Sequence, residues 1–150
     1  MSVYFDASVL IPTLIHQEAT GVVQRYLGAL GNEQRLISDF AASEVASALS
    51  RLVRMGALAE PEAFNRLVDF DAWRAATSIA AEVRNADMRH AYAFVRRFDL
   101  ALRAPDALHL AVSHRFDAIL VTLDRRLANA AGALGIAFAV PGEDNASDPR

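Results

Sequence analysis

The chain contains no cysteine and no lysine, because all 15 of its basic residues are arginine. Without cysteine there is no disulfide, no thiol nucleophile and no cysteine-based zinc or iron–sulfur site. Without lysine there is no Walker-type phosphate-binding loop and no Schiff-base chemistry. The reactive groups must therefore be carboxylates, imidazoles, hydroxyls or a bound hard cation.

Glycine and proline are also scarce, with 7 and 5 among the 150 residues. No apolar run approaches the ~20 residues that span a bilayer, and the 53% hydrophobic fraction is typical of a globular chain. Length and composition predict a single domain over residues 1–140 and a flexible polar tail over 141–150. The apolar start lacks the basic stretch and the cleavage site of a signal peptide, so we expect a cytoplasmic protein.

Short strand-like runs alternate with helical segments. Strands are expected at 3–5, 35–38, 118–122 and 136–140, and helices at 9–15, 18–30, 39–55, 61–73, 87–98, 105–114 and 124–134. Residues 75–86 fit either a helix or a short strand. Asp39 and Asp87 are interpreted as helix caps. The alternation predicts an α/β fold with a mostly parallel sheet that is covered by helices on both faces.

Four acidic residues are expected at one edge of this sheet. Asp6 follows the first strand and Asp124 follows the strand that ends at Thr122, so both lie at carboxyl ends, where parallel sheets bind ligands. Asp106 lies at a helix start, and Glu44 lies about one turn into the helix after the second strand. Asp6 is the hardest to explain as structural, because an apolar strand end is a buried place for a charge. Taken alone, Asp106 is equally well explained as a helix cap and Asp124 as a turn residue. Glu44 alone is better explained as an exposed helix acid.

Carboxylates gathered in this way repel one another, by roughly 3 kcal/mol for a pair about 5 Å apart at an effective dielectric of about 20. Since the chain has no lysine, a divalent cation is the simplest countercharge. Oxygen ligands favour hard ions, so Mg²⁺ or Mn²⁺ is expected rather than zinc. Such an ion can orient a water, lower its pKa and neutralise a phosphodiester under attack.

The remaining polar residues give weaker signals. The four histidines share no metal-ligand spacing, and His109, within one turn of Asp106, is given no direct role. Arg51, Arg103 and Arg125 lie near the acids in the sequence and are candidate contacts to the phosphates of a nucleic acid. Ion pairs on helix surfaces explain these arginines equally well.

Four motifs occur in order along the chain: VYFDASVL at 3–10, SEV at 43–45, LRAPDALHLA at 102–111 and LVTLD at 120–124. Their order and spacing resemble those of the PIN-domain family, and in particular of the VapC-type toxins of bacterial toxin–antitoxin pairs. The resemblance extends over residues 3 to about 140. The third and fourth motifs are specific as a pair, whereas the strand with its aspartate is not.

The resemblance implies a three-layer α/β/α sandwich and a Mg²⁺- or Mn²⁺-dependent endoribonuclease. Carried over position by position, the catalytic and metal-binding acids are Asp6, Glu44, Asp106 and Asp124. Ser8 and Thr122 match hydroxyl positions that support these acids. The resemblance also implies an RNA substrate, a homodimer and an antitoxin partner that inserts a segment near the site. Some relatives have a further acid where this chain has Arg125 and Arg126, so a fifth ligand is not expected.

Other interpretations are kept beside this one. A haloacid-dehalogenase-like phosphatase also begins with a strand and an aspartate, but it needs a second aspartate where this chain has Ser8. A receiver domain needs a lysine, which this chain lacks. A non-catalytic PIN-like module that binds RNA or protein is a further alternative, and the presence of all four acids speaks against it. A small DNA-binding antitoxin encoded by an adjacent reading frame would favour the toxin over this module.

Overall fold

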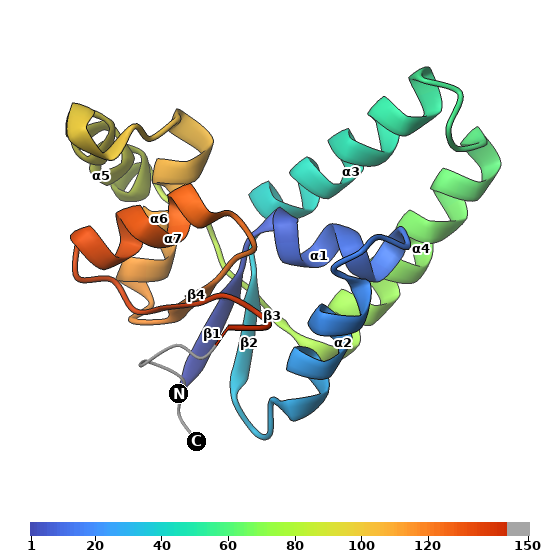
Figure 1. The fold of residues 1–150 in the computed structure, drawn as a ribbon, viewed down its shortest axis with the longest axis horizontal. Coiled ribbons are helices and arrows are strands. Elements are labelled where there is room, and N and C mark those ends of the chain that lie inside the picture. Colours follow the sequence, from blue (N-terminus) through green and yellow to red (C-terminus); the bar gives the residue numbers. More distant parts are fainter. Residues whose placement is uncertain (144–150) are drawn as a thin grey trace.

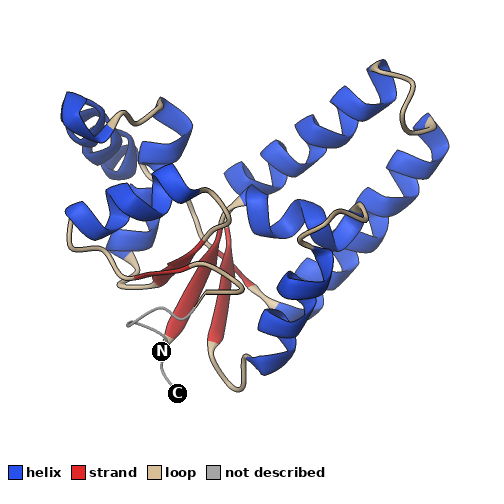
Figure 2. Ribbon diagram, in the orientation of Figure 1, coloured by secondary structure: helices blue, strands red, loops and turns tan. Residues whose placement is uncertain are grey.

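The computed structural model describes residues 1–143 and contains one sheet of five strands, all parallel (Figures 1 and 2). The strands are β1 (Ser2–Phe5), β2 (Gln34–Ile37), β3 (Ile79–Ala80), β4 (Ile119–Val121) and β5 (Phe138–Ala139). The helices are α1 (Ala7–Leu14), α2 (Thr20–Ala29), α3 (Asp39–Arg54), α4 (Glu60–Thr77), α5 (Asn85–Val95), α6 (Ala104–Arg115), α7 (Arg125–Ala133) and a short 3-10 helix, η1 (Phe98–Leu100). No helix in this part of the chain is long and apolar enough to cross a membrane.

The strand order is β3-β2-β1-β4-β5, so β1 lies at the centre of the sheet between β2 and β4. In register, Tyr4 of β1 is opposite Leu36 of β2, and Phe5 is opposite Val121 of β4. The chain builds outward from β1 to β3 and then returns across β1 to add β4 and β5. This reversal creates a switch point between β1 and β4, where the carboxyl ends of two neighbouring parallel strands lie side by side.

Alternate side chains of β1 pack into two separate cores. Tyr4 lies in a core built largely by α5, α6 and α7, whereas Val3 and Phe5 lie in a second core with α1 to α4. Figure 1 shows the same division, with α5–α7 on one side of the sheet and α1–α4 on the other. This arrangement confirms the predicted three-layer α/β/α fold. Of the tail predicted over 141–150, residues 144–150 lie outside the described residues.

The start of α3 and the ambiguous segment differ in detail from the sequence prediction. Ser38, not Asp39, is the cap of α3, because its Oγ accepts the N–H of Ala41 at 3.0 Å while Asp39 is already helical. Asp39 instead pairs with Arg74 of α4 at 2.9 Å. Residues 75–86 contain the end of α4, the two-residue edge strand β3 and the connection to α5.

Asp87 lies inside α5, two residues past its first residue, and does more than cap it. Its Oδ2 accepts the backbone N–H of Arg84 at 2.8 Å, and both of its oxygens accept from the guanidinium of Arg115 on α6, at 2.8 and 2.9 Å. Burial raises the pKa of Asp87, but the hydrogen bonds from Arg115 and Arg84 outweigh it and hold the pKa below its ordinary value of 3.8. Asp87 is therefore half of a buried ion pair that joins α5 to α6.

We expect Asp87→Asn to lower the free energy of unfolding by about 3–5 kcal/mol, because it leaves the largely buried guanidinium of Arg115 without its anion. Since the folded-state pKa is lowered, the stabilisation is present above the unfolded pKa and is lost as the pH falls through the folded pKa. Urea unfolding at neutral pH and at about pH 3 measures both effects. The control is Asp99→Asn, which removes the acid of an exposed ion pair with Arg97. We expect little change in its free energy of unfolding. An equal deficit at the two pH values would contradict this account.

Candidate functional site at the carboxyl edge of the sheet

Asp6 lies directly after β1, at the switch point. Its N–H donates to the carbonyl of Val121 at 3.3 Å, and its Oδ1 caps α1 by accepting the N–H of Val9 at 3.4 Å. Two hydroxyls donate to the carboxylate: Ser8 Oγ to Oδ1 and Thr122 Oγ1 to Oδ2, both at 2.6 Å. The two residues predicted to support the site therefore fix both oxygens of Asp6.

The carboxyl group of Asp6 is almost completely buried, with 4% of the residue exposed. This burial raises the pKa of Asp6 above 3.8, while the hydrogen bonds from Ser8, Thr122 and the backbone N–H of Val9 act in the opposite direction. An ionised carboxylate in such a place is costly unless a cation accompanies it. Buried acids with raised pKa values are concentrated at functional sites, which makes Asp6 the first candidate here.

Asp124 directly precedes α7. It lies two positions after Thr122, the last residue of the predicted strand. Its Oδ1 accepts the N–H groups of Arg126 at 2.9 Å and Leu127 at 3.3 Å, so it is a helix cap. Its own N–H donates to Thr122 Oγ1 at 3.0 Å, which ties it to the hydroxyl that holds Asp6. The cap uses only Oδ1 among the described contacts. Asp124 can therefore serve as a cap and as a ligand at the same edge.

Glu44 on α3 and His109 on α6 are in direct contact. The distance between Glu44 Oε2 and His109 Nε2 is 2.5 Å, and His109 Nδ1 lies 2.8 Å from Tyr4 Oη. The imidazole is buried, with 2% of the residue exposed. This contact is not apparent from the sequence, since 65 positions separate the two residues. The available signal was that His109 lies three residues after Asp106, which places both on the same side of α6.

Asp106 is the third residue of α6 and is paired with Arg103. Its Oδ2 accepts the backbone N–H of Arg103 at 3.4 Å and the Nε–H at 3.1 Å. The hydrogen bond and charge of Asp106 raise the pKa of Arg103, and the charges of Asp124 and Glu44 add to the effect. The guanidinium of Arg103 therefore lies in the field of three of the four predicted acids.

Thr122 links Asp6 to Asp124, and Arg103 lies in the field of Asp106, Asp124 and Glu44, but each acid is held by a different set of partners. Within residues 1–143, no three acidic or histidine side chains are close enough together to share a metal ion. Their chemistry nevertheless fits a hard cation, because every carboxylate donor is an oxygen and the best-buried one is costly to ionise alone. Arg103 forms an ion pair with Asp106, so a cation would compete with Arg103 for this acid.

The other two candidate phosphate contacts lie at the periphery. Arg125, at the start of α7, forms an ion pair with Glu143 and is exposed. Arg51 is exposed on α3, seven residues or roughly 10 Å along the helix from Glu44. That these arginines contact nucleic acid stays a prediction.

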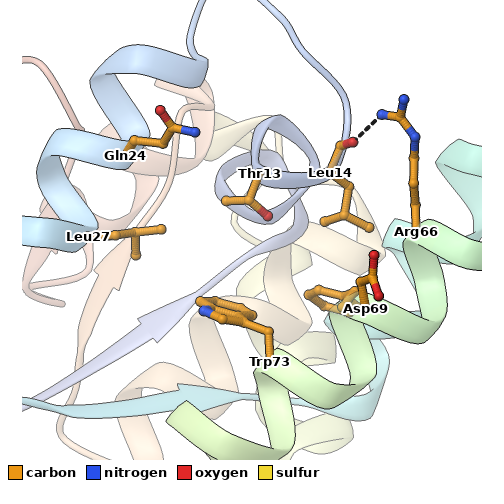
Figure 3. Close-up of a pocket in the computed structure, with 8 residues that line it drawn as sticks. Thr13, Leu14, Gln24, Leu27, Arg66, Asp69 and Trp73 are labelled. Atoms are coloured by element: carbon orange, nitrogen blue, oxygen red, sulfur yellow. Dashed lines mark hydrogen bonds between the residues drawn. The ribbon is translucent and has the colours of Figure 1, made fainter.

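A pocket of about 400 Å³ lies between α1, α2 and α4, at the far end of α1 from Asp6 (Figure 3). Leu14, Leu27 and Trp73 supply apolar walls, and Arg66 donates to the carbonyl of Leu14 at its rim. None of the predicted site residues lines this pocket. It is a feature separate from the acidic edge.

The chain was compared with known families and structures. The family model of the PIN domain matches residues 3–133. VapC20 from Mycobacterium tuberculosis, described as a sarcin–ricin loop cleaving toxin, has a TM-score of 0.68 at 16% identity, covering 86% of this chain and 95% of that one. A toxin–antitoxin complex from Klebsiella pneumoniae has a TM-score of 0.67 at 19% identity, covering 95% and 100%. VapBC2 from Rickettsia felis, bound to a promoter DNA fragment, has a TM-score of 0.67 at 10% identity, covering 93% of this chain and 98% of that one. A search of curated proteins finds no match.

Proposed function

The chain belongs to the PIN-domain family, and from this premise we propose that it is a metal-dependent endoribonuclease, the toxin of a toxin–antitoxin pair. The observation that carries the proposal is the buried carboxylate of Asp6 at the switch point between β1 and β4. Hydroxyl groups orient both of its oxygens. Asp124 donates its N–H to one of these hydroxyls, and the charges of Asp106, Asp124 and Glu44 act together on Arg103. Holding a cation is the role that makes such a costly arrangement useful.

We assign the role of holding Mg²⁺ or Mn²⁺ to four residues: Asp6, Glu44, Asp106 and Asp124. When bound, the ion would supply a water of lowered pKa and charge stabilisation at the phosphodiester. The chain's own part is orientation. Ser8 and Thr122 fix the Asp6 carboxylate. Arg103 already faces the negative charge at this edge, which makes it the first candidate to contact a phosphate of the substrate, ahead of Arg51 and Arg125.

We further propose RNA as the substrate and an antitoxin as the protein partner. Support for the partner comes from the compared structures, which include a toxin–antitoxin complex and a VapBC pair. Large apolar side chains are exposed on α5 and η1, namely Met88, Tyr92 and Phe98 at 54%, 67% and 86%. Exposed apolar groups of this size suit a protein–protein contact. The homodimer and the cytoplasmic location stay predictions.

A non-catalytic PIN-like module is the second candidate, and one contact favours it. Arg103 neutralises Asp106 in this structure, as an arginine would do in a site that no longer requires a metal. The two candidates differ in whether RNA is cut or only bound.

We expect the purified chain to cut single-stranded RNA in the presence of Mg²⁺ or Mn²⁺ and to lose this activity in EDTA, because carboxylates alone do not lower the pKa of water. A labelled RNA of mixed sequence, resolved on a gel and sequenced at its new ends, measures the cleavage. The control is Asp39→Asn, which changes an exposed acid of α3 that pairs with Arg74 and should leave the rate unchanged. Cleavage that persists in EDTA contradicts the role of the metal. RNA binding without cleavage in either metal supports the non-catalytic module.

A further inference from the structure

A chain of buried hydrogen bonds runs from the cap of α3, across β1, to the carboxylate of Glu44. Ser38 Oγ lies 2.8 Å from Tyr4 Oη, Tyr4 Oη lies 2.8 Å from His109 Nδ1, and His109 Nε2 lies 2.5 Å from Glu44 Oε2. Ser38 and Tyr4 are 0% exposed and His109 is 2% exposed. The chain therefore connects the interior of the sheet to one acid of the candidate site.

The direction of these bonds follows from counting protons. Ser38 Oγ accepts the N–H of Ala41 at 3.0 Å, and its own proton has Tyr4 Oη as its partner among the described residues. Because Tyr4 Oη accepts the proton of Ser38, its own proton is left to be donated to His109 Nδ1. With Nδ1 accepting, the neutral imidazole carries its hydrogen on Nε2 and donates to Glu44.

We propose that His109, ordered by Tyr4, is a positioning residue that fixes the orientation of the Glu44 carboxylate for the proposed nuclease reaction, on which this inference rests. The bond from His109 occupies Oε2, while no described residue donates to Oε1. One oxygen is therefore held and the other is left to face a cation or a water. Without this bond a half-exposed glutamate would populate several rotamers.

The surroundings of His109 distinguish this role from ordinary packing. Phe40 lies against the imidazole with a ring-centroid distance of 5.1 Å, and Tyr4 with one of 5.7 Å. Both ring nitrogens are used in a single chain of bonds whose outer end is the acid. A histidine needed only to fill the core would not have to be aimed at Glu44. Outer partners of this kind set the affinity of carboxylate sites for metal.

His109→Gln and His109→Asn form a matched pair of variants. The glutamine amide reaches the position of Nε2 and can still donate to Glu44, whereas the shorter asparagine amide reaches only the position of Nδ1. Tyr4→Phe removes the hydroxyl that orders the imidazole and leaves Glu44 untouched. Mn²⁺ binding to the metal-free proteins, read from the electron paramagnetic resonance signal of the free ion, compares them with wild type.

We expect the Kd for Mn²⁺ to rise roughly 10–100-fold in His109→Asn, to stay near the wild-type value in His109→Gln, and to fall between them in Tyr4→Phe. The Mg²⁺ concentration that gives half-maximal RNA cleavage should follow the same order. In the metal-free wild type, imidazole ¹⁵N shifts should report hydrogen on Nε2. Melting temperatures identify a variant that fails to fold, in which case Tyr4→Phe and the ¹⁵N spectrum decide.

Two results would overturn this inference alone. One is Mn²⁺ affinity that is equal in wild type and all folded variants, and the other is a wild-type imidazole with its hydrogen on Nδ1. Either can occur in a protein that binds Mn²⁺ and cuts RNA, so the proposed function would stand. A wild type that binds no Mn²⁺ and cuts no RNA overturns the proposed function, and this inference with it.

Discussion

Asp6→Asn should reduce RNA cleavage by roughly 100-fold or more, because changing residues that only support metal ligands already costs about 10–100-fold in metal affinity or activity. The metal-free variant should be as stable as wild type or more stable. Asparagine has the same shape, and the hydroxyls of Ser8 and Thr122 can each turn to suit an amide. Burial raises the pKa of Asp6, so the ionised carboxylate costs stability as the pH rises above 3.8 through the folded-state value. The gain in the variant should therefore appear at neutral pH and vanish in acid.

Melting curves with EDTA and with Mn²⁺ separate the two effects of Asp6→Asn. Because a cation that binds only the folded state stabilises it, Mn²⁺ should raise the Tm of wild type and have little effect on the variant. Ser8→Ala is the matched control, because it removes one hydrogen bond to Asp6 without changing charge and should lose less activity. Cleavage at the wild-type rate in Asp6→Asn would show that this carboxylate is structural.

The central strands could be predicted because their apolar runs are continuous. Residues 119–121 are buried throughout β4, and turn signals bound the run on both sides. The edge strand β3 was only one of two alternatives for residues 75–86, because its two residues are exposed and it exists through its pairing with β2. The cap of α3 was wrong by one position for a related reason. Ser38 and Asp39 are both good caps, and the extended backbone at Ser38 decides between them.

Candidate site residues could be placed from the sequence where they directly follow the end of a strand. Asp6 and Asp124 follow neighbouring parallel strands, so their shared edge was implied by the alternation of elements. The contact between Glu44 and His109 depends on how α3 and α6 are placed across the sheet, and no local pattern encodes that placement. The pairing of Arg103 with Asp106 has a local signal, a spacing of three residues at a helix start, and was predicted only as a possible surface ion pair.

Asp106→Asn is expected to reduce cleavage by roughly 100-fold or more, because losing a ligand should cost at least as much as losing a residue that supports one. We expect little change in its melting temperature. Repulsion among the acids, considered alone, would make the variant more stable. The structure alters that expectation, because the exposed Arg103 already pairs with Asp106 and its ion pair is lost at the same time. Asparagine at this position still accepts the N–H of Arg103, so the capping role survives and only the charge is removed.

Substitutions at Asp106 and at Arg103 should change the affinity for Mn²⁺ in opposite directions. Asp106→Asn removes an anionic ligand and should weaken Mn²⁺ binding, whereas Arg103→Gln removes a competing cation and should strengthen it. If the pair were only structural, neither change would alter Mn²⁺ affinity, and both would act through melting temperature alone. Calorimetric Mn²⁺ titration of the metal-free proteins, beside melting curves and RNA cleavage, distinguishes these cases. Weaker Mn²⁺ binding in Arg103→Gln would contradict competition for Asp106, and undiminished cleavage in Asp106→Asn would remove this acid from the metal site.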